Sequence, residues 1–461
     1  MSVLIVLFAL AFLMFVAYRG YSVILFAPIA ALLAVFLTDP HLVAPMFSNV
    51  FMVKMVDFIK LYFPVFMLGA IFGKVIELSG FSKSIVASVI KLIGKERAIL
   101  AIVLVCAVLT YGGVSLFVVV FAVYPFAAEL FRTGNIPKRL IPGTIALGAF
   151  TFTMDSLPGT PQIQNIIPST FFQTNTWSAP ILGLVGSAFI LIIGILYLEL
   201  CRKQAKLSGE GYGANLINEP ANITHNKLAN PVIAILPLFV VGISNFIFTR
   251  LIPVTYGKEF TLQVSDKSII VEVSKLTAIW SVEAALILGI LTVVLFAFKP
   301  VIKHFAEGSK AAINGALLAS LNTASEYGFG GVIAAMPGFL VVASGLQNIP
   351  NPLINEAISI TTLAGITGSA SGGLSIALAA MSNHFIEVAQ AMHIPLDVFH
   401  RIAAMASGGM DTLPHNGAVI TVLAVTGLSH KQAYKNIFVI TCIKTLAVFF
   451  VIGFYYITGW Y

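Results

Sequence analysis

A pentapeptide of the form Met-Asp-Ser/Thr-Leu-Pro occurs twice in the chain, each time within a long apolar region. The first copy begins at Met154 and the second at Met410, 256 residues later. Proline interrupts a helix, and a carboxylate in apolar surroundings is costly unless polar groups satisfy it. A chain that places both features in two apolar regions must therefore break two helices where backbone groups and carboxylates can find polar partners.

The composition identifies those apolar regions as membrane segments. Of the 461 residues, 58% are hydrophobic and 10% are charged, whereas a soluble domain carries roughly 25% charged residues. About ten segments are long enough to cross, or to enter and leave, a bilayer core. The first, residues 2–17, lacks a basic region and a cleavage pattern, so we expect a retained span rather than a signal peptide. We expect a polytopic membrane protein.

Charge and cysteine content exclude several classes of function. The net charge of +7 falls in short loops between apolar segments. This pattern fits the cytoplasmic bias of Lys and Arg and argues against a nucleic-acid surface. The three cysteines lie far apart and form no CxxC pair, so we expect neither a disulfide framework nor a metal site.

Two further matches extend the repeat. The sequence YGGVS at 111–115 matches SGGLS at 371–375 with an offset of 260, and NIP at Asn135 matches HIP at His393 with an offset of 258. Matches in the same order at nearly the same offset indicate a tandem duplication.

Loop charges predict how the two copies are oriented. The segments 78–97 and 132–139 are basic, so both are expected in the cytoplasm, and 98–131 between them is expected to be a re-entrant hairpin. The balanced loop 252–276 is expected outside, which places both ends of a second hairpin, about 352–392, outside as well. The copies are then inverted, and inverted repeats with discontinuous helices are typical of secondary transporters.

The expected architecture is an all-α polytopic membrane protein with two re-entrant hairpins and two broken helices. Its predicted segments are N-terminal spans at 1–50, a first repeat at 51–200 with a broken helix at about 140–172, a linker with central spans at 201–300, and a second repeat at 301–461 with a broken helix at about 400–427.

Long stretches of the sequence resemble a known family. Residues 143–172 (GTIALGAFTFTMDSLPGTPQIQNIIPSTFF), 320–333 (SLNTASEYGFGGVI) and 406–438 (ASGGMDTLPHNGAVITVLAVTGLSHKQAYKNIF) resemble the gluconate permease family of the ion transporter superfamily, and are closest to its D-3-hydroxybutyrate permeases. The resemblance implies proton-coupled uptake of small hydroxycarboxylates across the bacterial inner membrane, and a dimer with an elevator-like movement. Residues around the first broken helix differ from those of sugar-acid permeases, which weakens gluconate as the substrate.

Three carboxylates are candidates for carrying the coupling proton, because intramembrane carboxylates commonly mark ion or proton pathways. Asp155 and Asp411 lie in the two breaks, and Glu326 lies in a polar cluster expected near the cytoplasmic end of a span. The alternative for each aspartate is to cap the half-helix that follows the break. Glu326 could equally be a solvated interfacial residue.

The hairpin tips and the residues after each break are candidates for binding substrate. Glycines allow close approach of the backbone, and free N–H groups at half-helix starts favour a carboxylate. Tight packing by small residues is the alternative. The predicted substrate-binding residues are Gly112, Gly113, Ser115, Ser371, Gly372, Gly373, Ser375, Thr412, His415, Asn416 and Gln162, with Gln164 and Asn165 as further candidates.

Other charged residues suggest lesser roles. Lys74 and Lys444 are expected to snorkel to a cytoplasmic surface. Arg401 is expected on the external side, about 15 Å along a helix from Asp411. Glu283 is a weaker candidate for a coupling carboxylate.

Together these features predict a secondary transporter and no enzyme. We expect proton-coupled symport of a small hydroxymonocarboxylate, with 3-hydroxybutyrate favoured and without a cofactor or a metal. Gluconate, another sugar acid or sodium coupling are the alternatives, and an anion channel is a remote one. We expect a homodimer in the inner membrane of a bacterium, with both termini outside. An intramembrane acid–base enzyme using both aspartates is disfavoured, because catalytic pairs need no inverted scaffold.

Overall fold

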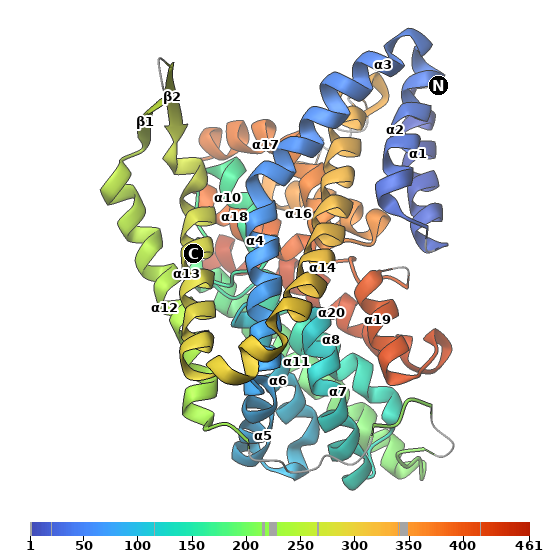
Figure 1. Cartoon of the computed structure of the whole chain (residues 1–461). Helices are drawn as coiled ribbons and strands as arrows, with labels where there is room; N and C mark the ends of the chain where they lie inside the picture. Colours follow the sequence, from blue (N-terminus) through green and yellow to red (C-terminus); the bar gives the residue numbers. More distant parts are fainter. Residues whose placement is uncertain are drawn as a thin grey trace.

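The computed structural model describes residues 2–19, 21–114, 116–213, 217–220, 228–264, 267–339, 341, 349–414 and 416–461. These residues fold almost entirely into helices (Figure 1). Within them, five helical segments are long and apolar enough to cross a membrane: Pro40–Leu78, Pro180–Leu207, Pro231–Tyr256, Val273–Phe296 and His430–Thr458. The other apolar segments form shorter helices or pieces of broken ones.

Each half of the chain contains one helical hairpin and one broken helix. The first half contains α1 (Ser2–Tyr18), α2 (Val23–Thr38), α3 (Val43–Met46), α4 (Met52–Leu78), α5 (Phe81–Ile93), α6 (Ala98–Tyr111), α7 (Leu116–Thr133), α8 (Ile141–Ala149), α9 (Phe152–Asp155), α10 (Ile163–Phe172) and α11 (Pro180–Leu207). The second contains α12 (Pro231–Tyr256), α13 (Val273–Phe296), α14 (Phe298–Ala334), α16 (Pro352–Thr367), α17 (Ala370–Ala391), α18 (Leu396–Ser407), α19 (Gly417–Thr426) and α20 (His430–Thr458). The ends of α4 and α14 are 256 residues apart, as are the two aspartates.

The all-α expectation needs one amendment. The loop predicted outside contains an antiparallel two-stranded hairpin, β1 (Glu259–Val264) and β2 (Lys267–Glu272). Apolar residues on both of its faces, Phe260 and Leu262 on β1 and Ile269 and Ile270 on β2, are exposed. The hairpin extends beyond the ends of α12 and α13, clear of the helical body (Figure 1).

Local signals explain where the second hairpin begins and turns. The Asn351 side chain accepts from the Ile354 N–H and is followed by proline at the first helical position, so α16 starts there. Gly368 ends α16 with φ of 65°, a left-handed conformation that favours glycine. The Ser369 hydroxyl then accepts from the Gly372 N–H and starts α17. A tight hairpin follows.

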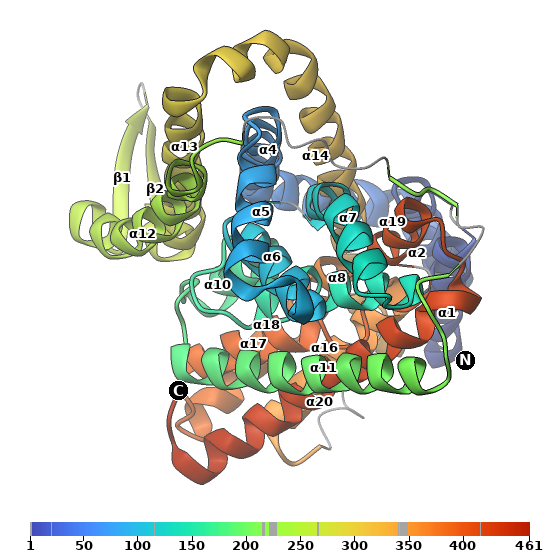
Figure 2. The same cartoon turned by 90° about the horizontal axis from the view of Figure 1, so that it is seen from below.

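The two hairpins lie at different levels of the molecule. Figure 1 shows α6 and α7 in the lower half and α16 and α17 in the upper half. Both views place α1 and α2 on the flank opposite α12 and α13 (Figure 2). The long helices α4 and α14 pack against each other, as do α11 and α20. The breaks in α8–α10 and α18–α19 lie in the interior between these layers.

The connector between the halves is docked on the basic end of the first hairpin. Lys138 pairs with Glu219 at 2.7 Å, and Arg132 also pairs with Glu219. Arg139 makes two hydrogen bonds of 2.7 Å to Glu210. These bonds from the guanidinium hold the pKa of the Glu210 carboxyl below its usual range. The basic loops therefore bind acidic residues of the connector in addition to any interaction with lipid headgroups.

Candidate functional site

The first break runs from the end of α9 at Asp155 to the start of α10 at Ile163. Asp155 is buried, and Ser156 Oγ donates to its Oδ1 over 2.9 Å. Thr160 Oγ1 donates to the Thr153 carbonyl over 2.7 Å, which satisfies a backbone group that the lost helix leaves free. The break is thus a folded loop with internal partners for its polar groups.

Arg401 fills the first break from the other half of the chain. Its guanidinium, fully buried, donates to Asn165 Oδ1 at 2.9 Å, to the Ser178 carbonyl at 2.7 Å and to the Asp155 carbonyl at 3.2 Å. Because Arg401 is fully buried, its guanidinium does not face an external solution. The distance from Arg401 to Asp411 along the helix does not determine its role, because its guanidinium donates to groups in and around the first break.

The second break is held by a buried ion pair. Lys444 Nζ pairs with the Asp411 carboxylate and also donates to the Phe150 carbonyl, at the C-terminal end of α8, over 3.1 Å. Lys444 is 2% exposed, so the expectation that it snorkels to a surface is wrong. Lys74, in contrast, is partly exposed and pairs with Glu77, as a surface lysine does.

The two aspartates belong to one charge cluster. Lys444, Asp411 and Arg401 all act electrostatically on Asp155. A Cβ placed on Gly408, in the second break, would lie 2.0 Å from Asp155 Oδ2, so the two breaks are in direct contact. Of the two carboxylates, only that of Asp411 is ion-paired, whereas Arg401 bonds the backbone carbonyl of Asp155 and not its carboxylate.

Each broken helix is tied to the tip of its own hairpin by a side-chain amide. Gln162 Nε2 donates to the Thr110 carbonyl over 2.7 Å, and Asn416 Nδ2 donates to the Gly368 carbonyl over 2.8 Å. Both donors occupy the N-cap position of the half-helix after the break. We call these two bonds the tip latches. Two residues predicted to bind substrate therefore direct these amides at the protein itself.

The turns of the hairpins lie at Gly112–Gly113 and at Gly368–Ser369. Gly113 has φ of 94°, which only glycine adopts readily, and Gly112 faces the Leu238 side chain. The segment 371–375 was expected at the second turn, but it forms the first turns of α17. Gly373 there allows α16 to approach, because a Cβ would lie 2.2 Å from the Ala364 nitrogen.

The predicted residues Ser115 and His415 lie outside the described residues. Thr412 Oγ1 shares a hydrogen bond of 2.6 Å with Thr441 Oγ1 in the second break. Glu283 lies on α13 and is partly exposed, away from both breaks in sequence.

Glu326 lies against the second tip. Its side chain is buried on α14, and a Cβ on Gly372 would lie 1.8 Å from its Oε2, so only glycine fits there. The Ser369 hydroxyl interacts with the carboxyl, yet Oε2 itself has no hydrogen-bond partner. Among the described residues no cation acts on this carboxyl. Thr323 and Ser371 add hydroxyls 3.3 Å apart beside it.

Several buried side-chain atoms without hydrogen-bond partners lie near the two tips, and others lie elsewhere. In the described part of the chain they are Thr110 Oγ1, Gln164 Oε1, Trp177 Nε1, Ser325 Oγ, Glu326 Oε2, both carboxyl oxygens of Glu356, and Ser375 Oγ. Thr110 precedes the first turn and Gln164 begins α10, whereas Ser325, Glu326 and Ser375 surround the start of α17. Buried polar atoms normally have partners, so a set without them marks groups available to a ligand.

Glu356 is a residue that the sequence analysis missed. It lies on α16, is fully buried, and neither carboxyl oxygen has a partner. Its position inside the predicted hairpin was itself a signal, because a carboxylate in a re-entrant segment is as costly as one in a break.

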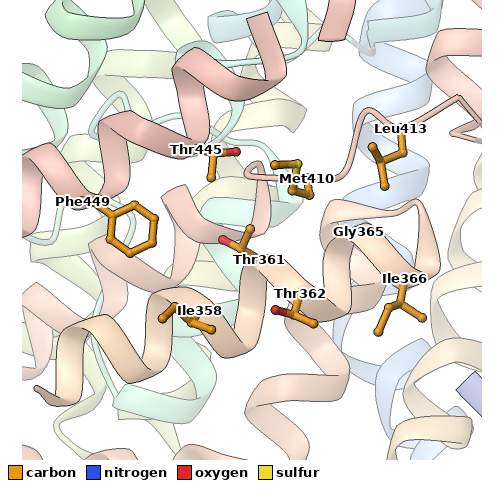
Figure 3. Close-up of a pocket in the computed structure, with 9 residues that line it drawn as sticks. All are labelled: Ile358, Thr361, Thr362, Gly365, Ile366, Met410, Leu413, Thr445 and Phe449. Carbon is orange, nitrogen blue, oxygen red and sulfur yellow. The ribbon is translucent and has the colours of Figure 1, made fainter. Parts of the chain in front are cut away.

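An open groove of about 430 Å³ runs beside the second break (Figure 3). It is lined by Ile358, Thr361, Thr362, Gly365, Ile366, Met410, Leu413, Thr445 and Phe449. The Thr361 and Thr445 hydroxyls donate to the carbonyls of Ala406 and Thr441. Because those hydroxyls are engaged and most other lining groups are apolar, the groove suits hydrocarbon better than a carboxylate.

Comparison with known proteins adds one close relative. No protein-family model matches the chain. Over 470 residues the chain is 58% identical to the uncharacterized transporter YxjC of Bacillus subtilis (strain 168), with 100% of both sequences covered. Two solved structures, the YdaH transporter of Alcanivorax borkumensis and Neisseria gonorrhoeae MtrF, from a class of antimetabolite efflux pumps, each match at 12% identity and a TM-score of 0.48. They cover 89% and 87% of this chain, and 88% and 82% of their own. A TM-score of 0.48 is too low to support an inference about this chain, whereas 58% identity over the full length indicates a close relative.

Proposed function

The chain belongs to the same family as the Bacillus subtilis transporter YxjC, and we propose that it is a secondary active transporter that carries a small hydroxymonocarboxylate together with a proton. Membership of that family and the apolar spans make it a membrane transporter. The substrate, the coupling ion and the mode of movement are our proposal.

Two inverted repeats form the proposed transport unit. The helix succession repeats at an interval near 256 residues, and the two hairpins lie at opposite levels in Figure 1. The connector that carries basic and acidic residues belongs on the cytoplasmic side, and the β1–β2 hairpin on the external side. This orientation places both chain termini outside the inner membrane of a bacterium. We further propose a homodimer in which the hairpins and broken helices move together as an elevator.

One observation carries the proposal: buried polar atoms without partners, on Thr110, Glu326 and Ser375, lie near the two hairpin tips. The Ser375 hydroxyl can donate to a carboxylate, and Gln164 Oε1 can accept from a hydroxyl group. The start of α17 adds free N–H groups and the positive end of a helix of 22 residues. Small hydroxycarboxylates offer the matching groups, and 3-hydroxybutyrate is the favoured substrate ahead of gluconate.

Glu326 is the carboxyl that best fits the coupling role. Asp411 is paired with Lys444, and Asp155 lies in the field of Lys444 and Arg401, whereas Glu326 has no cation beside it. A substrate carboxylate at the start of α17 would be repelled by an ionised Glu326. Substrate binding therefore requires a proton on Glu326. This requirement couples substrate transport to proton transport without direct contact between the proton and the substrate.

Proton coupling is favoured over sodium coupling by how the breaks are built. Sodium is bound in such breaks by unwound backbone carbonyls. The carbonyls of Asp155, Thr160 and Phe150 already accept from Arg401, Asn165 and Lys444. A protonatable carboxyl is left as the more available ion site.

Uptake by the purified protein in liposomes tests the function. We expect radiolabelled 3-hydroxybutyrate to accumulate under an inward proton gradient and to be displaced by related hydroxyacids, with no response to sodium. Glu326→Gln should uncouple uptake from the gradient, whereas the half-exposed Glu77→Gln should behave as the parent. Uptake that is indifferent to the proton gradient in the parent protein would reject the proposal. Unsaturable conductance in planar bilayers would indicate a channel.

A further inference from the structure

Hairpin α16–α17 contains a carboxyl that has no part in the coupling role proposed for Glu326. Glu356 lies in the second turn of α16, and its side chain is 0% exposed. Both of its carboxyl oxygens are buried without a hydrogen-bond partner. No other residue in the described part of the chain has both carboxyl oxygens in this condition.

The surroundings of Glu356 supply no compensating charge. Helix α16 packs against α17, α18, α20 and α1. These helices carry Glu387, Asp397, Arg401 and Lys444, but no titratable group on any of them acts electrostatically on Glu356. An ionised carboxylate with neither donor nor cation is strongly disfavoured in such a place, whereas a neutral carboxylic acid is tolerated. Glu356 therefore holds a proton in this conformation.

This proton is distinct from the one assigned to Glu326. Twelve residues of helix, about 18 Å, separate Glu356 from the turn at Gly368, beside which Glu326 lies. The two groups are too far apart to share a proton. Offsets of 256 to 260 place the counterpart of Glu356 within residues 96–100 of the first half. Glu96 and Arg97 precede α6, and the residues of this range that lie in α6 are apolar. Buried carboxyls are thus associated with the second hairpin.

We propose that Glu356 is a second proton site and that it makes transport electrogenic. The inference rests on the proposed function. One proton moving with a monocarboxylate carries no net charge, whereas two protons carry one positive charge per substrate. Proton exchange at Glu356 requires α16 to leave its present packing, because neither oxygen is accessible here. Its loading and release are thereby tied to movement of the hairpin.

The first test needs no substrate. Infrared spectra of the full-length protein in liposomes should contain a carbonyl band from a protonated carboxylic acid that is lost in Glu356→Gln and retained in the control Glu77→Gln. Absence of such a difference would show that Glu356 is ionised, and would overturn the proposal.

The second test measures charge per substrate. Inward current and uptake of 3-hydroxybutyrate, or of gluconate if that is the acid taken up, are recorded on the same liposomes. We expect about one positive charge per molecule in the parent and in Glu356→Asp, and none in Glu356→Gln, while proton-driven uptake remains within about twofold. Equal charge ratios in parent and Glu356→Gln would overturn the second site and leave the proposed function intact. Uptake without a response to protons in the parent would instead refute the proposed function.

Discussion

Replacing Asn416 with aspartate should open the second hairpin without unfolding the protein. The side chain has two separate tasks in the structure. Its Oδ1 accepts from the Ala418 and Val419 N–H groups and so caps α19, while its Nδ2 donates to the Gly368 carbonyl at the tip. Aspartate has nearly the same shape and keeps the acceptor, but it cannot donate. The change therefore removes the tip latch and preserves the cap.

The expected magnitude follows from the partner that is left behind. A hydrogen bond contributes about 0.5–1.5 kcal/mol, and a buried carbonyl without a donor costs about 1–3 kcal/mol. Gly368 is buried, so the larger figure applies when the tip stays in place. Detachment of the tip should become roughly 5- to 140-fold more favourable, since 1.4 kcal/mol corresponds to a factor of ten.

Cysteine labelling measures the detachment. In a background without Cys106, Cys201 and Cys442, a single cysteine at Ser371 is treated with a membrane-impermeant maleimide from outside. Asn416→Asp should label at least fivefold faster than the parent while keeping its melting temperature within a few degrees. Asn230→Asp is the matched control, because Asn230 caps α12 as an acceptor from Val232. Equal labelling rates in Asn416→Asp and the parent would refute the role of the latch.

Three further predictions concern other parts of the site. Lys444→Met leaves the buried Asp411 carboxylate unpaired and should destabilise the protein by about 3–5 kcal/mol. Adding Asp411→Asn should restore most of the lost melting temperature. A double variant that melts as low as Lys444→Met would contradict the ion pair. Gly372→Ala places a methyl group against the Glu326 carboxyl, so uptake should fall at least tenfold with normal expression; unchanged uptake would contradict the close contact. The pKa of Glu210 is lowered in the folded protein, so its ion pair should protect the connector from acid protease at pH values above about 4.3. The protection should be lost as the pH falls through the lowered pKa of the folded protein. Glu210→Gln should show no such change in protection with pH.

Helix interruptions were predictable because their causes are local. Proline at positions 158 and 414 and the apolar runs on either side require breaks wherever the chain goes. The side chains that satisfy the breaks were not predictable, since Lys444 and Arg401 reach them from helices distant in sequence. The prediction that Lys444 snorkels used its distance from a helix end, and so assumed that the nearest polar partner of its ammonium group is water. Its partners, the Asp411 carboxylate and the Phe150 carbonyl, exist only after the two halves have packed.

The register of the repeat shows a different limit of sequence patterns. The Gly-Gly pairs match at an offset of 260, but at 256, the offset of the aspartates, Gly112 aligns with Gly368. The structure places the turns at these two glycines. Gly372 and Gly373 resemble the first tip because close packing also selects glycine: one faces a carboxyl and the other faces the backbone of α16. The same Gly-Gly dipeptide thus has a different structural cause in each half: a turn in the first and close packing in the second.

The bonds between the halves constrain which parts of the protein can move. Lys444 of α20 donates to the residue after α8, and Arg401 of α18 donates to the last residue of α9, so both breaks are joined by buried charge-assisted bonds. Separating the two repeats at this point would expose or orphan two cations and two carboxylates, a cost that substrate binding would have to offset. Sliding the hairpins, the breaks and α20 together past α4 and α14 costs none of those bonds. We therefore expect the proposed elevator movement to cost less than a rocking movement between the repeats. Cross-linking α8 to α20 should then leave transport intact, whereas the same cross-link would stop a rocking mechanism.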